Sequence, residues 1–339
     1  MRNSKEILNL SKKIAVVRTD RLGDMILTLP LANALKKRFP SAQVTMIART
    51  YTKPLLYNST ALDNYFFVDE FENGIKDIFK NNKFDTVFFP HPRFDEAFAA
   101  FKAGIKLRIG SAYRFYSFLY NCKIREHRKE SLKHEAEYNV NMLSLLMNEN
   151  FETVLPSIYI KPKALDSIIK KLKELSVGSE FIIIHPGSGG SAYDWNVNNF
   201  AVLAELIYKK LNLNVLVTGI ESEFEKCRTL CEISKHSINC CGLFDLEEMI
   251  ALISKSKMLI ANSTGVLHIA AALNTNVLGL FPNSAHLSQK RWGPYSKNSF
   301  VVNPPQSNNL KLNDDMSLIT VEKVFEKVEI LLHKSTIGL

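Results

Sequence analysis

The chain has 339 residues, of which 46% are hydrophobic and 23% charged, and its formal net charge at pH 7 is +9. This length and composition predict a soluble protein of about two domains and exclude collagen-like and disordered chains. No apolar run approaches the ~18 residues that a membrane-spanning helix needs, and the polar first 13 residues are unlike a secretory signal.

Short apolar runs alternate with helical periods through the first half of the chain. The apolar runs predict strands at Ile14–Arg18, Gln43–Ala48, Tyr65–Val68, Thr86–Phe89 and Leu107–Gly110. Helical spacing predicts helices at Asp24–Phe39 (with Pro30 interrupting it), Gly74–Asn81, Phe94–Ala103 and Glu135–Met147. Such alternation predicts a parallel sheet wound on both faces.

The pattern breaks at residues 155–162, where two prolines mark a linker. A second series then predicts strands at Phe181–His185, Asn214–Thr218, Met258–Ala261, Val277–Phe281 and Phe300–Val302. It also predicts helices at Ala164–Leu175, Val197–Leu211 and Val321–Leu332. We therefore expect an α/β protein with domains at 1–160 and 161–318 and a final amphipathic helix within 319–339.

A polar turn after one predicted strand has the residues of an anion site. Thr264 is a natural N-cap for the helix that follows, and Gly265 lets a ligand approach the backbone. His268 lies four residues after Thr264 and therefore on the same helical face. A phosphate or pyrophosphate suits this helix N-terminus. A capped helix with a core histidine explains the segment equally well.

A second loop of the same kind follows the predicted strand that ends at His185. The loop at 186–191 contains Ser188, Gly189 and Gly190, and its N–H groups could form an anion-binding nest. It is neither a P-loop nor a GxGxxG fingerprint. Two strand–loop–helix units of this type in one half of the chain favour a nucleotide phosphate.

Basic residues concentrate in the segment from Lys102 to Lys133, whose net charge is +7 and which also contains five aromatic residues between Tyr113 and Tyr120. A nucleic-acid surface, a surface for anionic lipid or a phosphorylated acceptor, and a solvated face are the three interpretations. Because no nucleic-acid module is recognisable, we favour the second and expect no nucleic-acid partner.

The five cysteines form no CxxC pair. A zinc site from Cys227, Cys231 and Cys240 is conceivable, but spacing of four residues on a helix favours packed thiols. We expect no metal and a reduced, cytoplasmic protein.

Several motifs resemble glycosyltransferase family 9, the lipopolysaccharide heptosyltransferases. They are the opening Ile14–Pro30 with its Arg21-Leu-Gly-Asp24, the following Leu35–Pro40, then His185-Pro-Gly-Ser188 and Asn262–His268, in the family's order. The resemblance implies two Rossmann-like domains facing across a cleft (GT-B type), with the C-terminal helix returning to the first domain. It also implies inverting transfer of a sugar from a nucleotide donor, such as ADP-heptose, to lipopolysaccharide core or a related glycolipid.

The resemblance also assigns roles. Asp24, which alone would favour a helix cap, becomes the catalytic base. The donor motifs supply the donor-binding residues Ser188, Gly189, Thr264, Gly265 and His268. The place of Glu223 after a predicted strand adds it to the donor-binding residues, and the basic segment supplies Arg114, Arg125 and Arg128, which we expect to bind the acceptor together with Arg21. Glu223 could bind ribose hydroxyls or be a solvated first-turn carboxylate. The enzyme would act at the cytoplasmic surface of the inner membrane as a peripheral protein.

The chain has no Asp-x-Asp tripeptide, so we expect neither a metal nor another cofactor. Two residues depart from the family pattern: Ser263 replaces an aspartate, and Tyr193 replaces a lysine that would balance diphosphate charge. Arg18, Arg21 or Lys290 could supply that charge instead.

Two other functions fit the same sequence. A sugar-nucleotide epimerase shares the two-domain architecture, and a non-catalytic nucleotide-binding or membrane-docking module would use Asp24 only as a cap.

Overall fold

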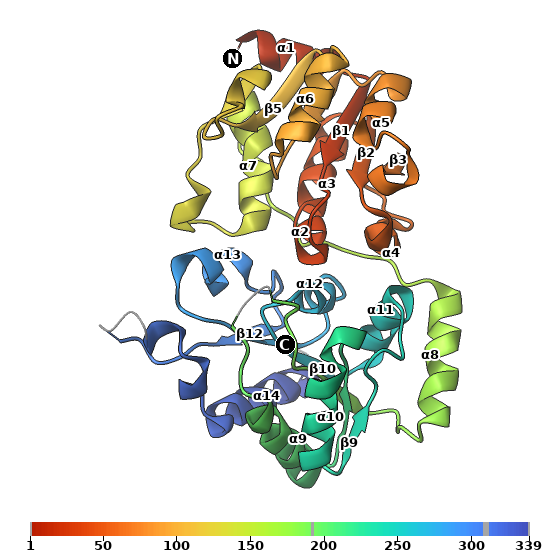
Figure 1. Ribbon diagram of the computed structural model, residues 1–339, viewed down its shortest axis with the longest axis vertical. Helices are drawn as coiled ribbons and strands as arrows, with labels where there is room; N and C mark the ends of the chain where they lie inside the picture. The colour runs from red at the N-terminus through yellow and green to blue at the C-terminus, as the bar shows by residue number, and fades with distance from the viewer. Residues whose placement is uncertain (1, 191–192, 308–311, 338–339) are drawn as a thin grey trace. The chain divides into compact units, whose positions relative to one another are not determined.

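The computed structural model describes residues 2–190, 193–307 and 312–337, so Ser191, at the end of the predicted glycine-rich loop, lies outside the described residues. The chain divides into two compact units, Met1–Tyr159 and Ile160–Leu339. Each unit contains a six-stranded parallel sheet with helices packed on it (Figure 1). The α/β class with two Rossmann-like units is thereby confirmed.

The first unit holds the sheet of β1 to β6. Its strands are β1 (Lys13–Val17), β2 (Gln43–Ala48), β3 (Asn64–Phe67), β4 (Thr86–Phe88), β5 (Leu107–Ser111) and β6 (Cys122–Ile124). Its helices are α1 (Arg2–Leu10), α2 (Leu22–Ile26), α3 (Leu29–Arg38), α4 (Lys53–Leu56), α5 (Ile75–Asn82), α6 (Phe94–Lys102) and α7 (Glu135–Met147).

The second unit holds the sheet of β7 to β12. Its strands are β7 (Phe181–His185), β8 (Asn214–Val217), β9 (Ser237–Asn239), β10 (Met258–Asn262), β11 (Val277–Leu280) and β12 (Ser299–Val302). Its helices are α8 (Pro162–Glu174), α9 (Val197–Leu211), α10 (Phe224–Ile233), α11 (Leu246–Lys255), α12 (Gly265–Ala272), α13 (Gln289–Trp292) and α14 (Val321–Ile337).

Both sheets have the same strand order. The first runs β3-β2-β1-β4-β5-β6 and the second β12-β11-β10-β7-β8-β9, which is the doubly wound Rossmann order in each case. The order reverses between β1 and β4 in one unit and between β7 and β10 in the other. Ligands of such sheets bind outside the carboxyl ends of the strands at this reversal, so the topology singles out the loops after these four strands.

The final helix has the amphipathic pattern expected from the sequence, and its return to the first unit stays a prediction. Helix α14 packs on α9 and β12 within the second unit. Its buried Val324 and Val328 belong to the core formed by α9 and the second sheet. The apolar stripe read from the sequence is therefore real, and it covers its own unit's sheet.

Local differences have simple causes. The single predicted helix from Asp24 to Phe39 is two helices, α2 and α3, because Pro30 suits the first turn of a new helix and not a helix interior. The three-residue edge strands β6 and β9 were not predicted from the sequence. Within the described residues, no helix is long and apolar enough to cross a membrane.

Candidate active site

A buried arginine organises the carboxyl end of β1. The Arg18 side chain is 2% exposed. Its Nε donates to Asp20 Oδ1 at 2.6 Å and its Nη2 donates to Asp24 Oδ1. Glu135 of α7 lies 3.7 Å from Nη1. Burial acts to lower the pKa of Arg18, but the three carboxylates outweigh it and raise the pKa, so a permanent cation sits under this part of the sheet edge.

Asp24 lies in the middle of α2, beside that cation. The N-cap residue of α2 is Arg21, so the structure excludes the helix-cap alternative for Asp24. Burial raises the pKa of Asp24 to about 6, although the Arg18 guanidinium opposes the shift. A carboxyl group that is 14% exposed and titrates near neutral pH is suited to accept a proton.

A second buried carboxyl group lies across the β1–β4 reversal, and it was not among the residues predicted from the sequence. Glu96 of α6 is 4% exposed and accepts a hydrogen bond from the Thr19 hydroxyl. Its other oxygen, Oε2, has no hydrogen-bond partner among the described residues, and burial raises the pKa of Glu96 to about 7. His91 Nδ1 lies 3.5 Å from Asp20 Oδ2 in the same cluster.

The four predicted acceptor arginines have different surroundings. Arg21, Arg114 and Arg125 are exposed. Arg128 instead holds α7: its Nη1 donates to Glu135 Oε1 at 2.7 Å and to Asn139 Oδ1 at 2.9 Å. These bonds give Arg128 a structural role besides any contact with an acceptor.

In the second unit, Asn262 fixes the loop after β7. Strands β7 and β10 are neighbours, with His185 paired to Ala261. The fully buried Asn262 donates to the Pro186 carbonyl at 2.7 Å and accepts from the Trp195 backbone N–H at 3.0 Å. The glycine-rich loop is thus held at both ends by a residue at the end of β10.

Glu223 closes the same loop from the other side. Its Oε1 accepts from the Gly189 N–H at 3.1 Å and its Oε2 from the Ile220 N–H at 3.1 Å. A Cβ on Gly187 would come within 1.9 Å of Glu223 Oε1, so the loop can approach this closely only with glycine there. With a side chain 10% exposed, Glu223 is not the solvated carboxylate of the alternative interpretation.

The loop after β10 leads into α12. Thr264 is the N-cap residue, but its side chain makes no capping hydrogen bond. The expected hydroxyl cap is therefore wrong. Thr264 precedes the helix with an extended backbone, and its side chain does not cap the helix. Gly265 begins the helix and His268 is buried in its first turns. Since β10 and β7 are neighbours, this helix N-terminus and the loop at Ser188 share one sheet edge.

A lysine beside this edge was also missed by the sequence analysis. Lys226 of α10 forms an ion pair with Asp194, whose other oxygen lies 3.3 Å from Asn262 Nδ2. Lys226 therefore places a cation beside Asp194, one residue after Tyr193, where the resemblance calls for a lysine. Arg18, one of the replacements suggested from the sequence, is paired with Asp20 and Asp24 in the first unit, just as Lys226 is paired with Asp194 in the second.

Comparison with known proteins identifies the family. The family model of glycosyltransferase family 9 (heptosyltransferase) matches residues 75–318. The chain belongs to glycosyltransferase family 9. It is thus a heptosyltransferase-like enzyme, as expected from its motifs.

Individual family 9 proteins match along almost the whole chain. An inferred glycosyltransferase of Haemophilus influenzae is 27% identical, over 95% of this chain and 97% of its own. Lipopolysaccharide heptosyltransferase 3 of Escherichia coli is 21% identical, over 93% and 98%. The solved structure of the Escherichia coli ADP-heptose lipopolysaccharide heptosyltransferase II has a TM-score of 0.79 at 21% identity, covering 96% of this chain and 99% of that one.

Proposed function

We propose that this family 9 enzyme transfers heptose from ADP-heptose, with inversion and without a metal, to lipopolysaccharide core or a related glycolipid. The names of the matched relatives support the donor and acceptor classes. The observation that carries the proposal is Asp24, a buried carboxylate at the carboxyl end of β1 with a pKa raised to about 6. We place the acceptor at Arg21, Arg114, Arg125 and Arg128.

In the proposed reaction, the acceptor hydroxyl oxygen attacks the anomeric carbon while Asp24 takes its proton. The bond from that carbon to the diphosphate breaks on the opposite face, so the configuration inverts and ADP leaves. Arg18 keeps Asp24 oriented through its Nη2, and the cation stabilises the ionised form that accepts the proton.

Charge on the leaving diphosphate needs stabilisation. The N-terminus of α12 at Gly265, with His268 in its first turns, offers a positive dipole end for it. Ser188 and Gly189 lie in the neighbouring loop, where the Gly189 N–H donates a hydrogen bond to Glu223. We propose that ribose hydroxyls bind Glu223 and that Lys226 supplies the missing positive charge. Among the described residues, no three acidic, histidine or cysteine side chains gather as a metal site.

The acceptor class implies a place of action. A glycolipid acceptor is held in a bilayer, and a nucleotide-sugar donor is made in the cytoplasm. We therefore propose that the enzyme works at the cytoplasmic surface of the inner membrane as a peripheral protein.

One assay tests the proposal against its alternatives. ADP release from ADP-heptose is measured with and without core-lipid acceptor, in excess EDTA and with added magnesium, and the anomeric configuration of the product is read by NMR. We expect acceptor-dependent ADP release that survives EDTA. Conversion of the donor to a new sugar nucleotide without acceptor would indicate the epimerase. ADP binding without turnover would indicate the non-catalytic module. A strict magnesium requirement would contradict stabilisation of the leaving group without a metal.

A further inference from the structure

Helix α6 buries its small residues and exposes its large ones. Ala97, Ala99 and Ala100 are packed in the core of the first unit. Phe94, Phe98 and Phe101 are 48%, 37% and 48% exposed, and their spacing of four and three residues puts them on one face. Amphipathic helices of globular proteins normally turn large apolar side chains inward. This reversed helix therefore calls for something that covers its outward face.

The exposed rings lie in one stripe, and three of them stack on one another. Phe94 stacks on Phe98 with ring centroids 5.9 Å apart and on Phe115 at 6.1 Å. Phe115, which is 85% exposed, lies in the loop that follows β5. The stripe therefore runs along α6 from its last turn to the carboxyl edge of the sheet, where Arg114 and the proposed acceptor side lie.

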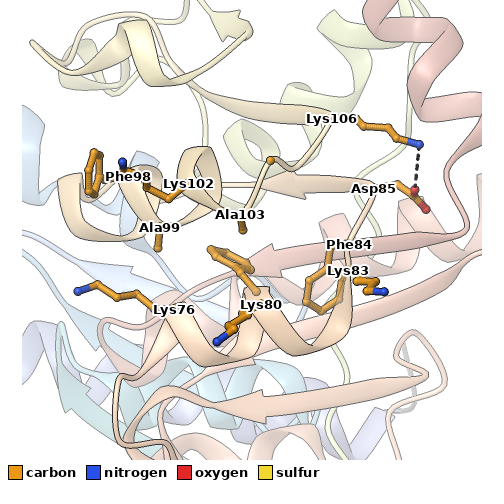
Figure 2. A pocket seen from close by; sticks show the side chains of 12 residues that line it. Lys76, Lys80, Lys83, Phe84, Asp85, Phe98, Ala99, Lys102, Ala103 and Lys106 are labelled. Carbon is orange, nitrogen blue, oxygen red and sulfur yellow. Dashed lines mark ion pairs between the residues drawn. The ribbon is translucent and has the colours of Figure 1, made fainter.

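The other end of the stripe leads into a basic pocket between α5 and α6. The pocket has a volume of about 700 Å³ and is lined by five lysines (Lys76, Lys80, Lys83, Lys102 and Lys106) together with Phe98. Figure 2 shows Lys76 and Lys80 on one side of it and Phe98 and Lys102 on the other. Lys102 Nζ lies 5.6 Å from the centre of the Phe98 ring, so the stripe and the pocket are one surface.

The single acidic side chain of the pocket does not neutralise it. Asp85 accepts hydrogen bonds from the Lys12 and Lys13 backbone N–H groups at 2.9 and 3.1 Å, and it lies 3.9 Å from Lys106. Among the described residues, the other four lysines of the pocket form no ion pair with a carboxylate. Their charge is available for an anionic ligand with an apolar part.

We infer that the α5–α6 surface, made of this phenylalanine stripe and the lysine pocket, docks the enzyme on an anionic lipid bilayer. Aromatic side chains enter the boundary between headgroups and acyl chains, and the lysines bind lipid phosphates. A second copy of the chain fits less well, because a symmetric dimer sets each patch against itself and would oppose lysine to lysine. The inference rests on the proposed function only for the identity of the bilayer as the cytoplasmic leaflet.

Vesicle sedimentation tests the surface. The full-length enzyme is mixed with vesicles of 70% phosphatidylcholine and 30% phosphatidylglycerol, or of phosphatidylcholine alone. We expect binding to the anionic vesicles only. Replacing Lys76, Lys80 and Lys102 by glutamine should weaken it roughly 100-fold, at about a factor of five for each charge near an anionic surface. Phe98→Ser with Phe101→Ser should weaken it at least roughly tenfold.

Matched variants of the second unit serve as controls. One control set removes the same charge from exposed positions of α8 (Lys163→Gln, Lys170→Gln and Lys173→Gln). The other set removes exposed apolar side chains (Ile169→Ser with Ile233→Ser). We expect each control set to bind vesicles like the unaltered enzyme. ADP affinity should be unchanged in every variant, which shows that the donor unit is intact.

Three results would overturn the inference. These are equal losses in the second-unit controls, equal binding to the two vesicle types, and a dimer in sedimentation equilibrium that the phenylalanine changes dissociate. If the phenylalanine variant does not fold, the lysine variant decides alone, because its three side chains are exposed. Since vesicle binding needs neither donor nor acceptor, it can succeed even if the proposed heptosyl transfer fails, and the reverse also holds.

Discussion

At the scale of single residues, the reactivity of Asp24 depends on Arg18. The guanidinium is bonded to Asp20 and Asp24 at once, which fixes the orientation of the carboxylate while burial keeps its pKa near neutral. A carboxylate in water titrates about two pH units lower and is a weaker base. Burial therefore strengthens Asp24 as the base that we propose, and the arginine keeps the buried charge paired.

Asp24→Asn should lower turnover by roughly 10²–10⁴-fold, the usual loss for a general base, without changing ADP affinity or the fold. In the unaltered enzyme, activity should fall as the pH drops through about 6, where Asp24 is protonated. Steady-state kinetics between pH 5 and 9 give both results. Near-normal turnover by the asparagine variant would remove Asp24 from the chemistry.

Glu96 makes a different prediction, about stability. Its pKa is about 7 in the folded protein and 4.5 when unfolded, so between these values the folded state binds more protons. The contribution of Glu96 to the free energy of unfolding is complete below pH 4.5 and is lost as the pH rises to 7. The free energy of unfolding changes by about 3 kcal/mol over this range. Glu96→Gln keeps an acceptor for Thr19 and should be more stable than the native chain at pH 8 and similar at pH 4.5.

Urea unfolding at the two pH values measures that difference for both proteins. Asp20→Asn is a suitable control, because it removes a neighbouring carboxylate whose side chain is more exposed. A Glu96→Gln protein that is less stable than the native chain at pH 8 would show that the ionised carboxylate makes a net favourable contact there.

Burial explains which site residues could be read from the sequence. Asp24, Thr264 and His268 lie in motifs that follow predicted strands, so the sequence alone predicts their position at a sheet edge. Glu96 looked like an ordinary acid in the first turn of a helix, which the dipole favours. Its hydrogen-bond donor is Thr19, 77 residues earlier. Lys226 of α10 likewise contacts Asp194, which is 32 residues earlier, and no local pattern predicts such pairs.

At the scale of elements, strand order explains why distant motifs meet. Long buried strands such as β7 and β10 were predicted well, because continuous apolar runs are typical of central parallel strands. Their adjacency brings the loop at Ser188 beside the start of α12. The short edge strands β6 and β9 have little apolar content of their own, and tertiary pairing alone makes them strands.

The N-terminus of α12 should act on phosphate more than on nucleoside. His268→Ala should weaken ADP binding by about 1.5–3 kcal/mol, the contribution of a charge-assisted hydrogen bond, and leave adenosine binding nearly unchanged. Isothermal titration with both ligands measures the difference. Equal losses for ADP and adenosine would indicate that His268 only supports the packing of α12.

At the scale of the whole molecule, the positive charge is divided between structural contacts and exposed side chains. The net charge of +9 is high, and the segment from Lys102 to Lys133 alone carries +7. Part of that segment is structural, since Arg128 holds α7 through Glu135 and Asn139. Arg114 and Arg125 are exposed and lie after β5 and β6, at the carboxyl ends of those strands. We propose that their charge binds the anionic acceptor.

Arg114→Ala with Arg125→Ala should therefore raise the acceptor KM and leave the donor KM unchanged. The attraction is electrostatic and is screened as the Debye length falls from ~10 Å at 0.1 M salt to ~3 Å at 1 M. The acceptor KM of the native enzyme should thus rise with salt, and that of the variant should change much less. Lys209→Ala with Lys210→Ala, exposed at the end of α9 in the second unit, is the matched control. A donor defect with normal acceptor kinetics would assign these arginines to the nucleotide, and the roles of the two units would have to be exchanged.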